Sequence, residues 1–375
     1  MSREKLVNVE EFERALERSG LDAVIASSLP NVFYTSGALI FTQVEIPDRL
    51  ALTVLPRRGD EVLIVCNLEE SLSREETWIQ DVRSYVEFAQ SPISLLADVL
   101  KEKRLSAGRI GIEKTRLSVA CYEELAEALP RARFEPCDGL FRAVRSIKTR
   151  GEIERFAHAA LVTERAIVDA FREAKAGQTE RDLLKLMVDN VWRLGASQVG
   201  FAVLAVGDQS WHAHATARDR EMEEGDLVRV DFGATFGGYG SDVARTAVVR
   251  RASAKQLDTY RKHQEVQRKA IEFMQPGVRA CDVFEHCVQA YADLGIELTL
   301  PHVGHGCGLE LHEMPILEPS NTEELRPNML ICIEPALLSQ ELGGYAVEDL
   351  VLIKEEGSAE ILTSYADTEE MFVIQ

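Results

Sequence analysis

Two aspartates flank a glycine pair in a stretch rich in β-forming residues. Asp231 lies within the run Leu-Val-Arg-Val-Asp-Phe-Gly-Ala-Thr-Phe, and Asp242 lies in a second such run after Gly237-Gly238. A Gly-Gly pair between two β-rich runs is typical of a hairpin. If these glycines form the loop, Phe236 pairs with Tyr239, and the aspartates become diagonal neighbours on one face, roughly 7 Å apart at Cα.

In this register Gly233 falls opposite Asp242 and leaves space beside its side chain. Two carboxylates that point into one space repel each other unless cations lie between them, and two metal ions about 3.5–4 Å apart would fit. The pair alone is equally consistent with a solvated acidic face.

A histidine cluster follows later in the chain, in His302-Val-Gly-His305-Gly-Cys-Gly-Leu-Glu-Leu-His312. The glycines that flank His305 predict a closely bent backbone, so this imidazole is presented from a loop. A single histidine is usually a core or surface residue, whereas a cluster among glycines indicates a functional site.

Two glutamates lie in otherwise apolar strand-like runs. Glu334 ends Met-Leu-Ile-Cys-Ile just before Pro335, and Glu348 lies within Tyr-Ala-Val-Glu-Asp-Leu-Val-Leu-Ile. Burying a carboxylate is costly unless it is paired or bound to a metal. Asp349 should point to the opposite face from Glu348 because side chains alternate along a strand.

Together these signals predict one metal centre. Its candidate ligands are one imidazole and four carboxylates, namely Asp231, Asp242, His305, Glu334 and Glu348. This oxygen-rich set suits two divalent ions of Mn, Co, Zn or Fe, and it excludes a cysteine-rich structural zinc site.

Composition places limits on the class of protein. The 375 residues are enough for two domains, and the net charge of -20 argues against nucleic acid or anionic membranes as partners. The charged start carries no secretory signal, and no apolar run is long enough to span a bilayer. Seven scattered cysteines without C-x-x-C spacing indicate reduced thiols in the cytoplasm.

The hydrophobic pattern divides the chain near residues 145–150. Before this point, strand signals alternate with helix signals, as in a sheet flanked by helices. The expected strands are 21–26, 50–55, 62–66 and 110–113, and the expected helices are 95–100 and 121–129. Residues 1–146 are therefore assigned to an N-terminal α/β domain and residues 147–375 to a catalytic domain.

Four helices and several strands are expected in the second part. A long helix starts at Gly151, and Thr179 is a plausible N-cap for the next one. The remaining helices are expected at 254–274 and 280–294, and the last strands at 329–334, 345–353 and 360–363.

With these residues in order, the chain resembles the pita-bread metallopeptidases, a group that includes Xaa-Pro aminopeptidase, prolidase, methionine aminopeptidase and creatinase. Residues 20–37 resemble the start of the N-terminal domain in the prolidase and Xaa-Pro branch, and residues 144–154 resemble the entry to its catalytic domain. The resemblance covers nearly the whole chain. It implies an α+β pita-bread catalytic domain behind a smaller creatinase/prolidase-type α/β domain, and a homodimer.

The resemblance also implies roles for individual residues. Asp231 would bind one metal, His305 and Glu334 the other, and Asp242 and Glu348 would bridge the two. Metal-activated water would attack a carbonyl carbon, with Glu334 as the proton acceptor. His312 matches a substrate-contacting histidine of the family, and His214 matches a second one, although His212 lies only two residues away.

Two positions depart from the pattern of proline-cleaving relatives. Ala346 stands where they carry arginine, and Leu338 stands where they often carry tyrosine. Loss of the arginine removes a clamp for a carboxylate. The departures weaken the case for a dipeptidase that requires a free carboxylate, and leave an aminopeptidase or a hydrolase of a small amide open.

The resulting hypothesis is a dinuclear metallohydrolase that cleaves Xaa-Pro or similar amide bonds in a peptide or small amide substrate. The alternatives are a creatinase-like hydrolase of a small non-peptide C–N substrate, and a non-catalytic binding module on the same fold. The complete ligand set argues against both, because such relatives usually lack part of it.

Overall fold

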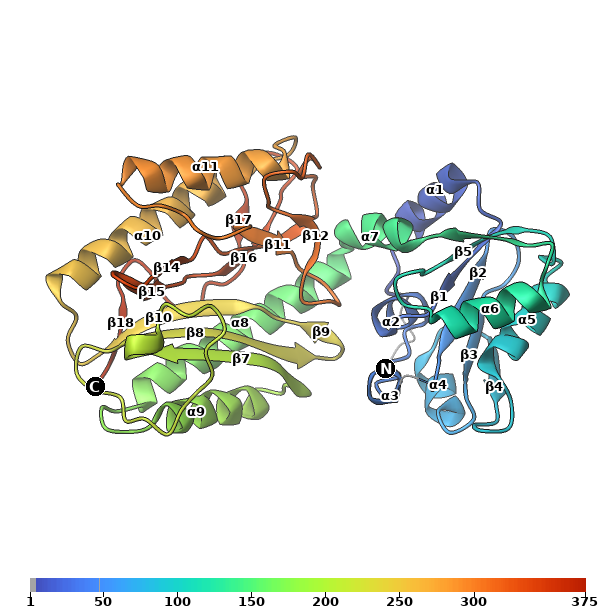
Figure 1. The fold of residues 1–375 in the computed structure, drawn as a ribbon, viewed down its shortest axis with the longest axis horizontal. Coiled ribbons are helices and arrows are strands. Elements are labelled where there is room, and N and C mark those ends of the chain that lie inside the picture. Colours follow the sequence, from blue (N-terminus) through green and yellow to red (C-terminus); the bar gives the residue numbers. More distant parts are fainter. Residues whose placement is uncertain (1–4, 47) are drawn as a thin grey trace. The chain divides into compact units, whose positions relative to one another are not determined.

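The computed structural model describes residues 5–46 and 48–375, and the chain forms two compact units, Met1–Thr149 and Arg150–Gln375 (Figure 1). The division predicted at 146/147 falls where α7 (Asp138–Ser146) ends, three residues before the second unit begins. Within the described ranges, the helices are either too short or too polar to cross a membrane.

A mixed sheet in the order β4-β3-β2-β1-β5-β6 forms the centre of the first unit. Its strands are β1 (Ala23–Ala26), β2 (Leu52–Pro56), β3 (Val62–Cys66), β4 (Asp81–Tyr85), β5 (Arg109–Ile112) and β6 (Arg133–Pro136). The helices beside α7 are α1 (Val9–Ser19), α2 (Leu29–Ser36), α3 (Thr42–Glu45), α4 (Glu70–Glu76), α5 (Pro92–Glu102) and α6 (Val119–Ala128).

Both faces of this sheet are buried, because alternate residues of its strands enter two different cores. Val24 and Ala26 of β1 pack with residues of α1, α2 and α7, whereas Ile25 packs with residues of α5 and α6. The predicted arrangement of a sheet flanked by helices is confirmed for this unit.

The second unit contains two larger sheets and one small one. The sheets have the strand orders β18-β10-β8-β7, with β9 paired to β8, then β12-β11-β13-β16-β17, and β14-β15. The first is built from β7 (Gln198–Val206), β8 (Leu227–Phe236), β9 (Tyr239–Gly240), β10 (Val243–Val249) and β18 (Phe372–Ile374). The others are built from β11 (Gly304–Gly306), β12 (Glu313–Ile316), β13 (Leu330–Ile333), β14 (Leu337–Ser339), β15 (Gly343–Tyr345), β16 (Asp349–Leu352) and β17 (Glu360–Ile361).

Two helix pairs accompany the two larger sheets, one beside each (Figure 1). The helices are α8 (Arg150–Glu173), α9 (Glu180–Arg193), α10 (Ala254–Phe273) and α11 (Ala280–Asp293), with a short 3-10 turn η1 (Gly207–Gln209). Thr179 caps α9 as predicted: its hydroxyl accepts from the N–H of Asp182, whose side chain accepts from the N–H of Thr179.

The hairpin register predicted for the two aspartates is confirmed. Phe236 pairs with Tyr239, and Asp231 pairs with Ala244 in the same register further along β8 and β10. Gly233 therefore lies opposite Asp242, and a Cβ atom at Gly233 would overlap the ring of Phe201 and the carbonyl oxygen of Ser241. Close packing thus requires glycine at this position.

The single strand predicted at 345–353 is wrong, because the structure divides it into β15 and β16. Residues 346–348 leave the ladder, and their N–H groups donate to partners on other elements. The long β7 strand was not predicted at all.

Candidate metal centre

The β8–β10 hairpin places Asp231 and Asp242 beside each other. Asp242 is almost fully buried, and the Oδ1 atom of Asp231 is buried without a hydrogen-bond partner. Burial raises the pKa of Asp231, and burial together with Asp231 raises the pKa of Asp242 well above its ordinary value. Both carboxylates therefore lie where a negative charge needs a nearby cation.

His305 enters the same space from β11 in the neighbouring sheet. Its ring is 0% exposed, and its Nδ1 atom lies 3.1 Å from the carbonyl oxygen of Gly306. A carbonyl oxygen can only accept, so Nδ1 carries the hydrogen and Nε2 presents a free electron pair. Burial lowers the pKa of His305 to about 3, which keeps the ring neutral.

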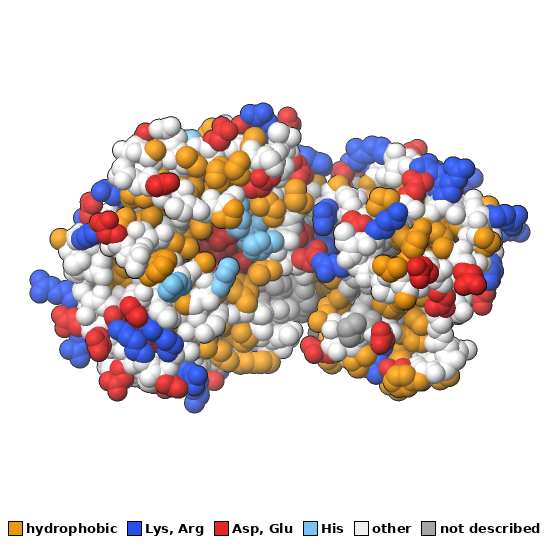
Figure 2. Space-filling view, in the orientation of Figure 1, with side chains coloured by type: hydrophobic (Ala, Val, Ile, Leu, Met, Phe, Trp, Pro, Cys, Tyr) orange, Lys and Arg blue, Asp and Glu red, His pale blue; other side chains and the backbone are white. Residues whose placement is uncertain are grey.

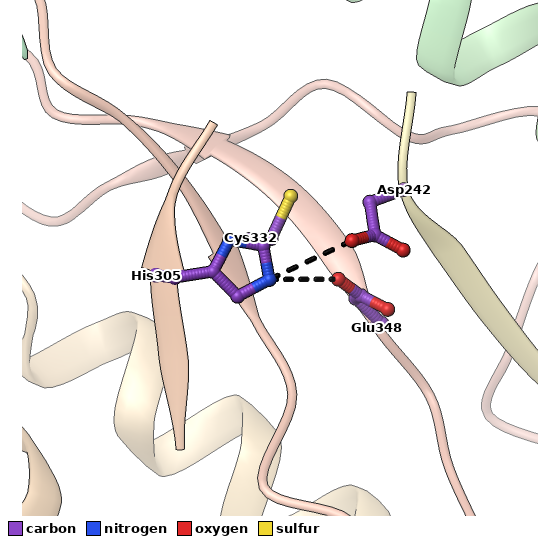
Figure 3. Close-up of side chains that lie close together, drawn as sticks. All are labelled: Asp242, His305, Cys332 and Glu348. Carbon is purple, nitrogen blue, oxygen red and sulfur yellow. Dashed lines mark ion pairs between the residues drawn. The ribbon is translucent and has the colours of Figure 1, made fainter. Parts of the chain in front are cut away.

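Three carboxylates surround that unprotonated nitrogen. His305 Nε2 lies 3.6 Å from Asp242 Oδ2, 3.4 Å from Glu334 Oε1 and 3.9 Å from Glu348 Oε1. Figure 3 shows His305, Asp242 and Glu348 pointing toward one another from different segments of the chain. Since Nε2 carries no proton in this tautomer, the nitrogen and the ionised carboxylates are all acceptors that face one another.

Glu334 and Glu348 follow and precede strands that pair directly. Glu334 comes just after β13 and Glu348 just before β16. Burial, together with the charge of Asp231, raises the pKa of Glu334 to about 8, and burial and Asp242 raise the pKa of Glu348 well above its ordinary value. Both carboxylate oxygens of Glu348 are buried without hydrogen-bond partners.

The buried acceptors of this centre match the ligands that divalent cations require. Orphaned oxygens on Asp231 and Glu348 and an orphaned nitrogen on His305 converge without donors to satisfy them. Buried acceptors of this kind are expensive unless a cation binds them. The donor set therefore fits hard or borderline divalent metal ions.

Cys332 also faces this centre, which the sequence analysis missed. Ligand atoms of Asp242, His305, Cys332 and Glu348 all lie within 4.8 Å of one another (Figure 3). Cys332 pairs with His305 across β11 and β13 and lies two residues before Glu334. The period of two along a strand was the signal that could have placed it on the ligand face.

Two further histidines surround His305. The ring of His312 stacks on His305 with centroids 3.9 Å apart, and His302 Nδ1 lies 3.5 Å from Glu334 Oε1. Ligand atoms of His305, His312 and Glu334 form a second group within 4.8 Å. Burial lowers the pKa of His312, and the nearby His214 lowers it further.

The loop between β7 and β8 carries His214 to the centre. His214 acts electrostatically on both Asp231 and His312, whereas the ring of His212 packs at a tilt against its neighbour Trp211, with ring centroids 4.1 Å apart. These contacts favour His214 over His212 as the histidine that faces the centre.

Arg229 of β8 holds the first part of this loop. It is 3% exposed, and its guanidinium donates to the carbonyl oxygens of Ser210, His212 and Ala213. Its charge also acts on Asp231 and Glu334. Arg229 is a further site residue that the sequence analysis did not identify, since an arginine in a strand carries no distinctive pattern.

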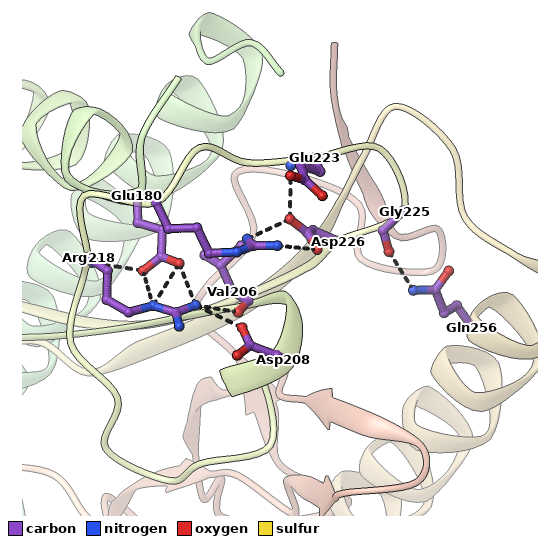
Figure 4. Close-up of polar contacts among 9 residues, drawn as sticks. Glu180, Val206, Asp208, Arg218, Glu223, Gly225, Asp226 and Gln256 are labelled. Carbon is purple, nitrogen blue, oxygen red and sulfur yellow. Dashed lines mark hydrogen bonds and ion pairs between the residues drawn. The ribbon is translucent and has the colours of Figure 1, made fainter. Parts of the chain in front are cut away.

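Two arginines hold the rest of the loop by pairing with three carboxylates (Figure 4). Arg218 contacts the buried Glu180 of α9 at 2.8 Å and also Asp208, and Arg220 forms a two-pronged pair with Asp226. Paired contacts of this kind fix orientation as well as position. The loop that presents His214 is therefore anchored along its length.

A buried ionic network supports the back of the centre. Arg245 is 0% exposed and donates to Glu164, Asp349 and the carbonyl oxygen of Glu348 at 2.7, 2.8 and 2.6 Å. Asp349 also accepts from Gln267 and Thr363. Asp349 thus points away from the ligand face as predicted.

A cavity of about 190 Å³ lies beside the centre. Asp242 and Cys307 line it together with Phe201, Leu309 and Leu311. On the surface of the second unit, histidine side chains gather around a recess with acidic side chains at its floor (Figure 2). The cavity is large enough for a small side chain and combines an apolar wall with an acidic end.

Comparisons with known proteins agree with this geometry. The model of metallopeptidase family M24 matches residues 154–355, and that of the creatinase/prolidase N-terminal domain matches residues 9–147. The chain is 31% identical to a Xaa-Pro dipeptidase of Pyrococcus horikoshii over 95% of both proteins. It is 30% identical to a Xaa-Pro dipeptidase of Pyrococcus furiosus over 93% of this chain and 96% of the relative.

Solved structures give the same result. A prolidase of Pyrococcus horikoshii superposes with a TM-score of 0.82 at 28% identity, covering 96% of this chain and 98% of that one. An X-Pro aminopeptidase of Thermotoga maritima superposes with a TM-score of 0.83 at 25% identity, covering 96% and 100%. The expected fold, a creatinase/prolidase-type N-terminal domain followed by a pita-bread catalytic domain, is confirmed. The chain belongs to metallopeptidase family M24 and is a metal-dependent hydrolase.

Proposed function

We propose that this chain is a dinuclear metallopeptidase that cleaves the amide bond of Xaa-Pro dipeptides or closely related short peptides. The observation that carries the proposal is the unprotonated Nε2 of buried His305 among the carboxylates of Asp242, Glu334 and Glu348. The dipeptidase names of the relatives support the choice of substrate. A creatinase-like activity has no comparable support.

The proposed metal ligands are those expected from the sequence. Asp231 would hold one ion, His305 and Glu334 the other, and Asp242 and Glu348 would be shared. Divalent cations bound by these residues would supply Lewis acidity and would lower the pKa of a bound water to a near-neutral value. We propose that the centre holds two ions, and that manganese, cobalt, zinc and iron are the suitable metals.

The protein's own groups would move the protons and orient the peptide. Glu334 is the most exposed of the three carboxylates around His305, so its carboxylate can accept a proton from water and deliver it to the leaving nitrogen. His312 and His214 can donate hydrogen bonds to the carbonyl oxygen and the leaving nitrogen as charge develops there. The loop contacts of Arg229 and Arg218 keep His214 in place for this role.

Ala346 and Leu338 would shape a less polar substrate site than the resemblance alone implies. Ala346 is buried in an apolar cluster with Ala244 and Ala336, so no cation from this position can clamp a free carboxylate. Arg229 is the nearby fixed cation, but its donors are directed at loop carbonyls. We therefore propose that short peptides are bound mainly through the metal centre and the apolar cavity wall.

Cytoplasmic location and a homodimer complete the proposal. All seven cysteines, which lie within the described ranges, are free. Free buried thiols suit a reducing compartment. The homodimer rests on the family resemblance.

A substrate panel tests the function. Metal-free protein would be assayed with Xaa-Pro dipeptides, longer Xaa-Pro peptides and small amides, with and without added Mn²⁺. We expect Mn²⁺-dependent release of proline from dipeptides. Full activity after thorough chelation, or cleavage of small amides alone, would contradict the proposal.

A further inference from the structure

The segment from β13 to β14 runs antiparallel to the segment from β15 to β16, and the two separate from each other beside Glu334 and Glu348. Ile333 pairs with Asp349, and Leu337 pairs with Tyr345. The register is the same on both sides of the opening, so Pro335 falls opposite Val347. In a continuous antiparallel pair the backbones here would lie about 4.8 Å apart.

Side chains bridge this opening. The N–H of Val347 donates to Nε2 of His263 at 3.0 Å, His263 Nδ1 lies 2.7 Å from the hydroxyl of Tyr291, and that hydroxyl donates to the carbonyl oxygen of Pro335 at 2.5 Å. Proline has no N–H to return a bond. Two side chains therefore occupy the place of one direct backbone hydrogen bond.

The direction of all three hydrogen bonds is fixed by chemistry. The Pro335 carbonyl can only accept, so Tyr291 donates to it and its oxygen accepts from Nδ1–H of His263. Nε2 of His263 then carries the electron pair that accepts from Val347. One tautomer of a neutral imidazole satisfies every group.

Both bridging side chains belong to the helix pair beside this sheet. His263 lies on α10 and Tyr291 on α11, and both are 0% exposed. Burial lowers the pKa of His263 to about 4, so the ring is neutral near pH 7. A buried polar group that loses its hydrogen-bond partner destabilises the fold by about 1–3 kcal/mol, so any displacement that breaks these hydrogen bonds is unfavourable.

We propose that His263 and Tyr291 are positioning residues that set the separation between Glu334 and Glu348, and thereby the metal affinity of the centre. Pro335 follows Glu334, and Val347 precedes Glu348, so each end of the bridge fixes the backbone next to one glutamate. The proposal rests on the proposed function, because it takes both glutamates as metal ligands.

Tyr291→Phe removes one oxygen atom and breaks the bridge with minimal change of volume. Isothermal titration of the metal-free protein with Mn²⁺ alone should give a dissociation constant raised about 10- to 100-fold, the usual effect of losing a group that orients ligands. kcat measured at saturating Mn²⁺ should fall much less than the affinity does, because excess metal ion refills the weakened site.

Tyr260→Phe is the matched control. Tyr260 lies on α10, is 1% exposed, and donates to the carbonyl oxygen of Thr368 at 2.7 Å, which is not next to a proposed ligand. It should lower the melting temperature about as much as Tyr291→Phe but leave the Mn²⁺ affinity unchanged. Equal Mn²⁺ affinities for the two variants would overturn the proposal and leave Tyr291 with a structural role.

Substitutions of His263 keep the test decisive if Tyr291→Phe does not fold. His263→Gln retains one acceptor and one donor, whereas His263→Leu retains neither, so the affinity should decrease in the order wild type, glutamine, leucine. Equal affinity in all three proteins would refute the bridge.

Glu348→Gln separates the two proposals. If it loses Mn²⁺ while the bridge variants bind normally, only the bridge is wrong. If Glu348→Gln binds Mn²⁺ as wild type does, the metal centre itself is wrong.

Discussion

The second unit contains two halves with related architecture and different ways of presenting ligands. In the first half, α8 and α9 accompany β7, β8 and β10. In the second, α10 and α11 accompany β11, β13 and β16 (Figure 1). Asp231 and Asp242 lie on one hairpin, whereas His305, Glu334 and Glu348 come from three separate segments.

The helices also fix the two halves differently. Thr163 of α8 bonds the hydroxyl of Ser241, next to Asp242, at 2.7 Å. In the second half the comparable contact is the His263–Tyr291 bridge. A local turn and a hydroxyl are sufficient in the first half, while the second half needs a titratable group and two helices. The comparison teaches that ligands distant in sequence require more packing to be held in register.

Removing one shared ligand from either half should have the largest effect. Asp242→Asn and Glu348→Gln should each lower activity about 10³-fold or more, equivalent to ~4 kcal/mol, because each would remove a carboxylate that we propose is shared by two metal ions. Steady-state kinetics and metal analysis measure the effect. Glu341→Gln, which alters an exposed pair with Lys255, serves as the control. A large loss of activity for only one of the two variants would show that the two halves do not contribute equally to the metal centre.

The loop of the first half should show a smaller effect limited to one histidine. His214→Ala should lower kcat/KM about 10²-fold, as expected for the loss of one hydrogen-bond donor in the transition state. His212→Ala should remain near wild type, because His212 packs on Trp211. The reverse result would assign the role to His212.

The pH dependence of stability should distinguish the halves next. His263 has a native pKa of about 4 against an ordinary value of 6.5, so the unfolded chain binds the proton more readily between these values. The contribution of neutral His263 to the free energy of unfolding is fully present above pH 6.5. It is lost as the pH falls to 4, and the total loss is about 3 kcal/mol.

Chemical denaturation at several pH values measures this contribution. His263→Leu should flatten the dependence between pH 4 and 6.5, whereas Thr163→Val should leave its slope unchanged because a hydroxyl does not titrate there. An unaltered slope in His263→Leu would show that His263 is not the group that titrates.

The smallest expected effect lies at the hairpin glycine. Gly233→Ala should destabilise the fold by about 2 kcal/mol, because its Cβ would overlap Phe201 and the Ser241 carbonyl. Gly240→Ala on the same hairpin meets only the Gly308 oxygen at 4.0 Å and should be well tolerated. Thermal melts measure both, and equal melting temperatures would contradict the packing argument.

The same contrast explains what could be predicted from the sequence. The Gly237-Gly238 turn fixes the register of the first hairpin locally, so the diagonal placement of Asp231 and Asp242 followed from turn chemistry. The ligand residues of the second half could be named from their unusual surroundings, but not their arrangement. The opening at Pro335 depends on side chains of α10 and α11, which are more than 40 residues away.

Other residues were missed for the same reason. Arg229 looks like any polar residue in a strand until the loop carbonyls of Ser210 and Ala213 pack around it. Cys332 looks like core until His305 is placed opposite it. The predicted domain boundary between residues 146 and 147 remains a prediction.

The most direct test of the central claim is anomalous X-ray diffraction from crystals of the Mn²⁺-loaded protein. The account predicts two peaks between the hairpin and the neighbouring sheet, about 2.0–2.3 Å from oxygen and nitrogen atoms of Asp231, Asp242, His305, Glu334 and Glu348. The absence of manganese from this space, or its binding elsewhere in the chain, would contradict the account.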